Sequence, residues 1–159
     1  MLKNEDFSDR LNQSIATCRL HYQRMKFAES RTKNLFPLDV TTYKSLDNDQ
    51  ISYTDQLIYR FSKLQDTMGN KLFPLILEGL HEDIENMAFI DILLKIEKFG
   101  LINDSRQWLL LRETRNIITH EYPFQLDFLI EGLNQLKEQL TVLSDIWEHT
   151  EEFIRQRLL

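Results

Sequence analysis

The chain is organised around the stretch Arg-Glu-Thr-Arg-Asn-Ile-Ile-Thr-His-Glu-Tyr-Pro, which runs from Arg112 to Pro123. Its apolar residues recur at helical spacing, and a proline disfavours the helical conformation for the residue before it. The sequence therefore predicts a helix that ends close to His120. An imidazole on the last turn lies at the negative end of the helix dipole, which favours its protonated form.

The polar side chains of this stretch are expected on one face of the helix. At roughly 100° per residue, five of them share an arc of about 140°: Arg112, Arg115, Asn116, Thr119 and His120. The opposite side is predicted to face the core, through Leu110, Leu111, Thr114, Ile117 and Ile118.

Trp108 and Leu109 project into the polar sector, where a solvated helix does not usually carry a tryptophan. We therefore expect another helix or another chain to cover this face, forming a polar cleft with an apolar floor. The alternative is that Trp108 packs under the preceding loop.

The composition predicts a single all-α domain over residues 1–159. The chain is 42% hydrophobic, enough for one core, and its 4 glycines and 3 prolines favour long helices over a turn-rich all-β fold. Cys18 is the only cysteine, so no intramolecular disulfide can form, and its place on an apolar stripe indicates a packed thiol. No signal segment and no membrane-length apolar run is recognised, so we expect a cytoplasmic protein without membrane contact.

The apolar spacing predicts an up-and-down antiparallel bundle of four to five helices with short loops. Helices are expected from Asp6 or Ser8 to about Lys33, with His21 on the solvent side, and from Ser52, with Asp55 in a capping box. The second helix should kink at Gly69 and Pro74 and continue to Leu80. Others are expected over 89–99, ending at Gly100, from Asp104, in a capping box with Gln107, and from about Phe124 almost to the end. Residues 40–50 read as an ordered connection or a short helical turn, and 82–86 as an acidic connection.

Charge is unevenly distributed along the chain, whose net charge is -6. Up to Leu38 there are seven lysines or arginines against four acidic residues, which leaves +3 there and -9 for the rest. A basic first helix can steer a polyanion to one side, or pair with an acidic partner or with the acidic remainder of the chain. The sequence leaves these alternatives open.

Metal and cofactor motifs give no positive prediction. Glu78 and His81 have the Glu-x-x-His spacing of di-iron bundles, but the second such pair that this site requires is missing. No Cys and His cluster suits zinc, and no glycine-rich phosphate loop is present. We therefore predict no metal site and no cofactor.

The segment Arg115-Asn-Ile-Ile-Thr-His120-Glu-Tyr122 resembles the signature of HEPN-domain proteins, in the Arg-x4-His-x-Tyr form typical of HEPN toxins. Residues 55–61 also resemble the second helix of this group. The resemblance implies a helical bundle that forms a homodimer in which two motifs face one cleft. It also implies a metal-independent endoribonuclease whose partner is a small nucleotidyltransferase antitoxin.

Under this resemblance, the chemistry of RNA cleavage suits the two defining side chains. Arg115 can hold the non-bridging phosphate oxygens with its planar fork, and His120 can take the 2′ proton or protonate the leaving 5′ oxygen. One chain offers one such histidine, so acid and base catalysis by imidazole would need the second subunit. Asn116, Thr119 and Arg112 are candidate supporting or phosphate-binding residues.

Tyr122 has a separate implied role, because the antitoxin of related toxin pairs attaches adenylate to the corresponding tyrosine. A tyrosine that simply caps the helix terminus is the alternative. Two other functions remain open for the whole chain: a non-catalytic substrate-binding or partner subunit of a nucleotidyltransferase, and a helical interaction protein in which the motif is fortuitous.

Overall fold

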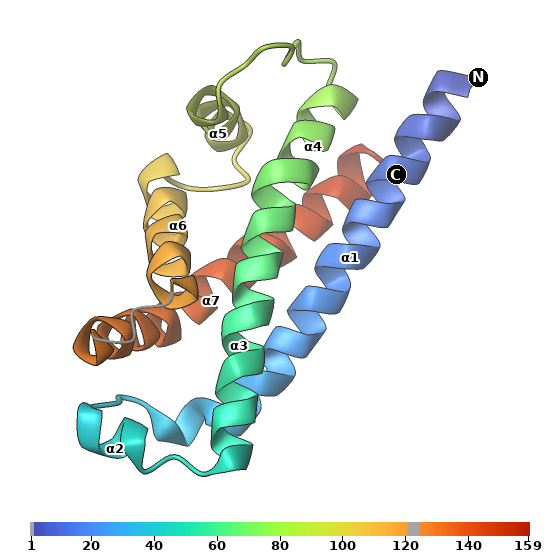
Figure 1. Ribbon diagram of the computed structural model, residues 1–159. Coiled ribbons are helices and arrows are strands. Elements are labelled where there is room, and N and C mark those ends of the chain that lie inside the picture. The colour runs from blue at the N-terminus through green and yellow to red at the C-terminus, as the bar shows by residue number, and fades with distance from the viewer. Residues whose placement is uncertain (1, 121–124) are drawn as a thin grey trace.

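The computed structural model in Figure 1 describes residues 2–120 and 125–159, and all regular secondary structure within these ranges is helical. The elements are α1 (Leu2–Thr32), a 3-10 turn η1 (Lys33–Leu35), α2 (Val40–Lys44), α3 (Asn48–Thr67), a π-helical segment η2 (Met68–Leu72), α4 (Phe73–Gly79), α5 (Phe89–Lys98), α6 (Ser105–Thr119) and α7 (Leu126–Arg157).

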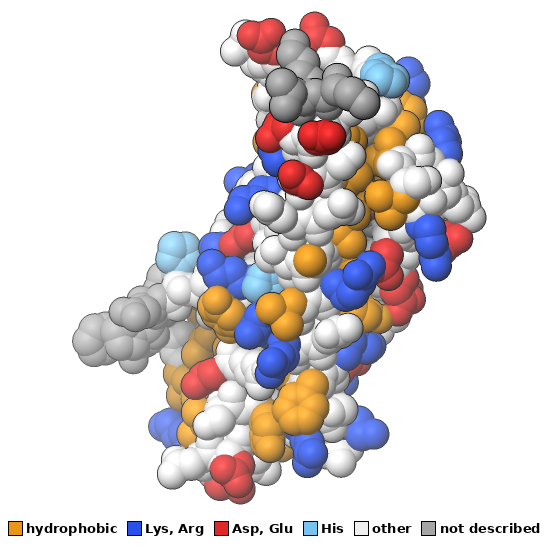
Figure 2. All heavy atoms as spheres, turned by 90° about the vertical axis from the view of Figure 1, so that its right-hand side faces the viewer, with side chains coloured by type: hydrophobic (Ala, Val, Ile, Leu, Met, Phe, Trp, Pro, Cys, Tyr) orange, Lys and Arg blue, Asp and Glu red, His pale blue; other side chains and the backbone are white. Residues whose placement is uncertain are grey.

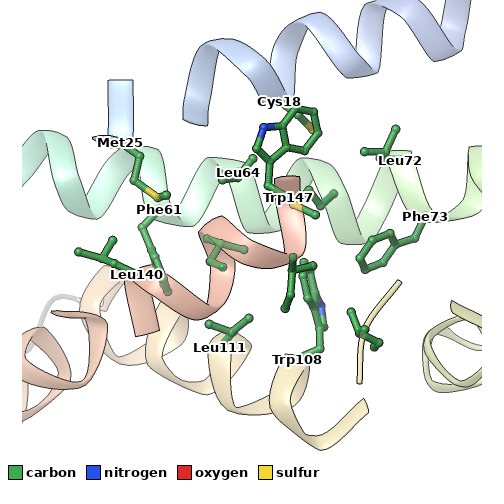
Figure 3. Packing of buried hydrophobic residues seen from close by; sticks show 14 of the residues in the cluster. Cys18, Met25, Phe61, Leu64, Leu72, Phe73, Trp108, Leu111, Leu140 and Trp147 are labelled. Atoms are coloured by element: carbon green, nitrogen blue, oxygen red, sulfur yellow. The ribbon is translucent and has the colours of Figure 1, made fainter. Parts of the chain in front are cut away.

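The long helices α1 and α3 run side by side in opposite directions, and α7, which is also long, crosses behind them (Figure 1). Apolar side chains at steps of three and four residues along α1 are buried, as the spacing predicts, among them Leu11, Cys18 and Met25. They pack with residues of α3, α6 and α7 in a continuous core that includes both tryptophans, Trp108 and Trp147 (Figure 3). The predicted packed thiol at Cys18 is confirmed, and burial raises its pKa to about 12.

The start of α3 lies four residues before the predicted one. Asp47 is the N-cap: its carboxylate accepts from the backbone N–H of Gln50, and the Gln50 side chain accepts from the backbone N–H of Asp47. This reciprocal pair satisfies two backbone donors that the first turn leaves free. The capping box predicted from Ser52 and Asp55 was therefore wrong, because Asp47 provides the same geometry one turn earlier.

The predicted continuation of the helix past Gly69 is confirmed, and the kink itself stays a prediction. The chain passes from α3 through the π-helical segment η2 into α4 without a break, and Pro74, which has no backbone N–H, lies just after the π-helical segment. A Cβ at Gly69 would lie 3.3 Å from the Trp108 ring, so the glycine lets the indole approach the helix backbone.

The second half of the chain holds α5, α6 and α7. Gly100, with a φ of +83°, ends α5 in the left-handed conformation expected of a glycine cap. Asp104 caps α6 as predicted, but its carboxylate accepts from the backbone N–H of Arg106 and not from Gln107. Gly132 of α7 faces α6 so closely that a Cβ there would lie 2.5 Å from the Cγ2 atom of Ile117.

Two side chains lie on the opposite side from the prediction. His21 was expected in solvent but is 9% exposed, with its Nδ1 atom 2.9 Å from Nη1 of Arg60, because α3 covers this side of α1. Leu110 was expected in the core but is 56% exposed, because Leu111, Thr114 and Ile118 already fill the buried side of α6. Within the described residues, no helix combines the length and apolar character needed to cross a membrane.

Candidate site at the end of α6

The helix that carries the Arg-x4-His motif ends where the sequence predicts. Helix α6 closes at Thr119, and His120 follows in an extended conformation with φ -77° and ψ 138°. The Thr119 hydroxyl donates to the carbonyl oxygen of Arg115 at 2.8 Å, which ties the last turn to the first motif residue. Thr119 and His120 are both exposed at this end. Tyr122 and Pro123 lie outside the described residues.

The cover expected over Trp108 comes from the same chain. The indole is 1% exposed, and its ring centroid lies 4.8 Å from that of Phe73, at the start of α4. The segment η2 closes over it at Gly69. Packing beneath another helix is therefore confirmed, and the apolar floor belongs to a hollow within one protomer. Whether a second chain also covers this face stays a prediction.

Arg115 makes a planar double contact with a carboxylate that the sequence did not indicate. Its Nε and Nη2 atoms donate to the two oxygens of Asp66 on α3, at 3.1 and 2.9 Å, and Nη1 donates to Thr119 Oγ1 at 3.2 Å. Both charged side chains are about one-third exposed. The guanidinium thus presents the bidentate geometry with which arginine holds carboxylates and phosphates. Asp66 lies 49 residues away in the chain, and no local pattern singles it out.

Two hollows flank this ion pair, and both count Arg115 and Asp66 among their lining residues. The first, of about 230 Å³, has Trp108 in its wall, and its polar side chains include Gln65, Asn70, Arg112 and Asn116. The Arg112 guanidinium lies 4.8 Å above the Phe89 ring, which also lines this hollow. Gln65 is 3% exposed, and its Nε2 atom has no hydrogen-bond partner within the described part of the chain.

The second hollow, of about 360 Å³, lies between α3 and the end of α6. Tyr59 and Lys63 from α3 and Thr119 from α6 line it together with the ion pair. The structure therefore groups Arg112, Arg115 and Asn116 around one hollow and Arg115 and Thr119 around the other. His120 follows Thr119 directly at the helix end. Polar side chains and the Phe89 and Trp108 rings line the first hollow, and neither hollow has His120 among its lining residues.

Glu78 of the Glu-x-x-His pair is bound by an arginine of α1. Glu78 accepts two hydrogen bonds from Arg10, and His81 takes a left-handed conformation with φ 63° just after α4. Across residues 2–120 and 125–159, no group of three or more His, Cys, Asp or Glu side chains is placed to hold a metal ion.

Comparison with known proteins gives one partial similarity. The chain is 37% identical over 70 residues to a protein of Haemophilus influenzae named "Probable ribonuclease HepT", in an alignment that covers 36% of this chain and 48% of that protein. The chain thus matches about half the length of this curated relative. No protein-family profile matches the chain, and no solved structure matches it. The chain is therefore distantly similar, over part of its length, to a probable ribonuclease.

Proposed function

We propose that residues 1–159 form a HEPN-like helical bundle that acts as the toxin of a toxin–antitoxin pair, a metal-independent endoribonuclease working as a homodimer. The observation that carries the proposal is the geometry of Arg115. Its guanidinium donates two hydrogen bonds to the Asp66 carboxylate beside an open hollow. The exposed imidazole of His120 lies within two turns of it, at the end of the same helix. The partial similarity to a probable ribonuclease supports the same conclusion.

In the proposed reaction, the 2′ oxygen of a ribose attacks the adjacent phosphorus and the bond from phosphorus to the 5′ oxygen breaks. Arg115 stabilises the charge that grows on the non-bridging oxygens, as fixed donors do in other transferase and hydrolase sites. His120 of one subunit accepts the 2′ proton, and His120 of the other donates a proton to the 5′ oxygen. The products are a 2′,3′-cyclic phosphate and a 5′-hydroxyl end. Asn116, Thr119 and Arg112 are proposed to bind phosphate.

Asp66 adds a condition to this mechanism. A carboxylate that neutralises Arg115 competes with the phosphate for the same guanidinium donors. We propose that the phosphate displaces Asp66 from one of its two bonds and that Asp66 keeps the fork oriented through the other. Tyr122, two residues beyond His120 in sequence, is the proposed site of adenylylation by a nucleotidyltransferase antitoxin.

A second function is favoured by the same ion pair. If Asp66 keeps Arg115 permanently neutralised, the chain acts as a non-catalytic substrate-binding or partner subunit of a nucleotidyltransferase. In that case the hollow beside Trp108, with its amide groups, holds part of a nucleotide.

The decisive experiment incubates 5′-labelled single-stranded RNA with the purified full chain in the presence of EDTA. We expect cleavage that leaves 2′,3′-cyclic phosphate ends, and a loss of at least 10²-fold in rate for His120→Ala, in keeping with the usual contribution of a general acid or base of about 10²–10⁴. His149→Ala is the matched control, because His149 is exposed on α7 and its Nε2 atom contacts the carbonyl oxygen of Gly100.

Shared use of the motif can be tested by mixing subunits. Mixing wild-type chain with excess His120→Ala should lower the activity per wild-type subunit, because a mixed dimer keeps only one of the two imidazoles that the reaction uses. The enzyme proposal is refuted if wild-type chain leaves the RNA intact under all these conditions. If a cognate nucleotidyltransferase then transfers adenylate only when this chain is present, the result would favour the second function, a non-catalytic partner subunit.

A further inference from the structure

Six exposed or partly exposed side chains of α1 and α3 combine cations with aromatic rings. The Arg31 guanidinium lies 5.3 Å from the Phe27 ring and 5.8 Å from the Tyr53 ring, which themselves meet edge to face at 6.0 Å. On the next turns of α3, Arg60 and Lys63 lie 5.1 and 5.7 Å from the Tyr59 ring. We call this set the α1–α3 strip: Phe27, Arg31, Tyr53, Tyr59, Arg60 and Lys63.

The two halves of the strip are joined by contacts between the helices. Phe27 of α1 meets Tyr53 of α3 at one end, and His21 of α1 meets Arg60 of α3 at the other. Tyr53 and Arg60 are seven residues apart, or roughly 10 Å along the helix. The exposed cation Arg24, which lies on α1 between His21 and Phe27 in sequence, adds positive charge to this helix.

The rings of the strip are more exposed than a purely structural role requires. Phe27 is 45% exposed and Tyr59 is 51% exposed, although an aromatic ring contributes most to stability when it is fully buried. Figure 2 views the side of the molecule on which α1 lies, and shows lysine and arginine side chains interspersed with hydrophobic ones over its middle and lower part. Alternating cations and exposed rings are what a single nucleic-acid strand requires, because the backbone needs positive charge and the bases need stacking surfaces.

The charge of the strip is positive although the chain as a whole carries -6. The strip contains no carboxylate. Two acidic residues close to it in sequence form ion pairs with residues outside the strip: Glu29 with Lys26, and Asp66 with Arg115. Asp55 lines the same hollow as Tyr59 and Lys63 and reduces the positive charge at that end. The strip therefore supplies a local basic surface on an acidic chain.

One end of the strip borders the hollow beside Arg115. Tyr59 and Lys63 belong to it, and they also line the hollow that Arg115 and Thr119 border. A strand that lies along α1 and α3 would therefore cross α3 at Tyr59 and arrive at the guanidinium of Arg115.

We propose that the α1–α3 strip binds single-stranded RNA and leads it to Arg115, with phosphates on Arg31, Arg60 and Lys63 and bases stacked on Phe27 and Tyr59. The choice of RNA as the substrate class rests on the proposed function, whereas binding itself can be measured without cleavage.

The experiment measures binding of fluorescent 12-nucleotide single-stranded RNAs, one of uridines and one of adenosines, by anisotropy, with His120→Ala as the common background. Removing two phosphate contacts with Arg31→Gln/Lys63→Gln should weaken binding about 25-fold at 0.1 M salt, since a salt slope of ~0.7 per contact is worth ~5-fold each. The slope itself should fall by about 1.4. Lys98→Gln/Arg157→Gln removes the same charge from α5 and α7 and should change affinity less than about twofold.

Ring and acid variants test the other half of the proposal. Tyr59→Leu should weaken binding about fivefold or more, which is the low end of base stacking on an aromatic ring, while the salt slope stays unchanged. Asp55→Asn should strengthen binding. Circular dichroism and light scattering of each variant show whether folding and oligomeric state are intact, and these exposed positions are expected to preserve both.

The outcomes separate this proposal from the proposed function. If Arg31→Gln/Lys63→Gln and Lys98→Gln/Arg157→Gln lose RNA affinity equally, RNA binding by the α1–α3 strip is refuted, even if the wild type cleaves RNA. If the strip variants alone weaken RNA binding but the wild type does not cleave RNA, RNA binding by the α1–α3 strip is supported and the proposed nuclease activity is not. Competition by a 12-residue polyglutamate peptide as effective as RNA, with no effect of Tyr59→Leu, would show a surface for acidic proteins and refute RNA binding.

Discussion

The contact between Gly132 and Ile117 determines how closely α7 approaches the helix that carries the motif. The Cβ of Gly132→Ala would lie 2.5 Å from Ile117 Cγ2 and 3.2 Å from Ile118 Cγ2, well inside van der Waals distance. Overpacking of this kind costs about 1–3 kcal/mol, and so short a contact belongs near the upper end. Replacing a mid-helix glycine by alanine returns about 1 kcal/mol through helix propensity.

The net expectation for Gly132→Ala is a loss of about 2 kcal/mol in the free energy of unfolding, or roughly 4–8 °C in Tm for a chain of this size. Urea denaturation followed by tryptophan fluorescence provides the assay, because Trp108 and Trp147 are each 1% exposed. Ile117→Ala removes the clashing atom. In that background Gly132→Ala should be neutral or stabilising by up to about 1 kcal/mol, a coupling of about 2–3 kcal/mol.

The steric explanation is refuted if Gly132→Ala costs the same with and without the Ile117 side chain. Ile117 lies between Arg115 and His120, so the single variant should also shift α6 and lower RNA cleavage, and the double variant should partly restore it. Gly100→Ala is the control, since a Cβ at Gly100 would meet no atom within 4 Å and its cost comes from a φ of +83° alone. That cost should not change in the Ile117→Ala background.

Three further predictions concern titration, the ion pair and the helix cap. Burial, and then the charges of Arg60 and Lys63, lower the pKa of His21, so the folded state disfavours the protonated ring. The free energy of unfolding should therefore fall as the pH drops below about 6.5 and level off below the lowered pKa. Urea denaturation of His21→Gln at the same pH values should not show this dependence. Asp66→Asn should cost at most about 1 kcal/mol in urea denaturation, because the pair with Arg115 is one-third exposed, and should increase RNA affinity in the anisotropy assay by releasing the guanidinium. Asp47→Ala should cost about 1 kcal/mol by removing the capping box of α3, whereas Asp55→Ala, in the capping box wrongly predicted with Ser52, should stay within about 0.5 kcal/mol.

Local rules were sufficient for several helix ends and for the buried stripe of α1. Pro123 and the apolar spacing located the end of α6 at His120, Gly100 ended α5, and the three-and-four spacing of α1 identified its buried stripe. The start of α3 was missed for a local reason as well, because more than one residue in this region satisfies the spacing of a capping residue, and only Asp47 is used. The resemblance of residues 115–122 to the HEPN signature likewise came from the sequence alone, and the roles of Arg115, His120 and Tyr122 stay predictions.

What the sequence by itself determined, therefore, is which segments are helical, where most of them end, and which side chains share a face of α6. Tertiary structure alone decided what each face meets. Asp66 pairs with Arg115 across 49 residues, α3 buries His21, and η2 covers Trp108, because these contacts depend on how helices pack and not on the spacing along any one of them. The α1–α3 strip has the same origin: its cations and rings come from two helices that become one surface only when α1 and α3 lie side by side.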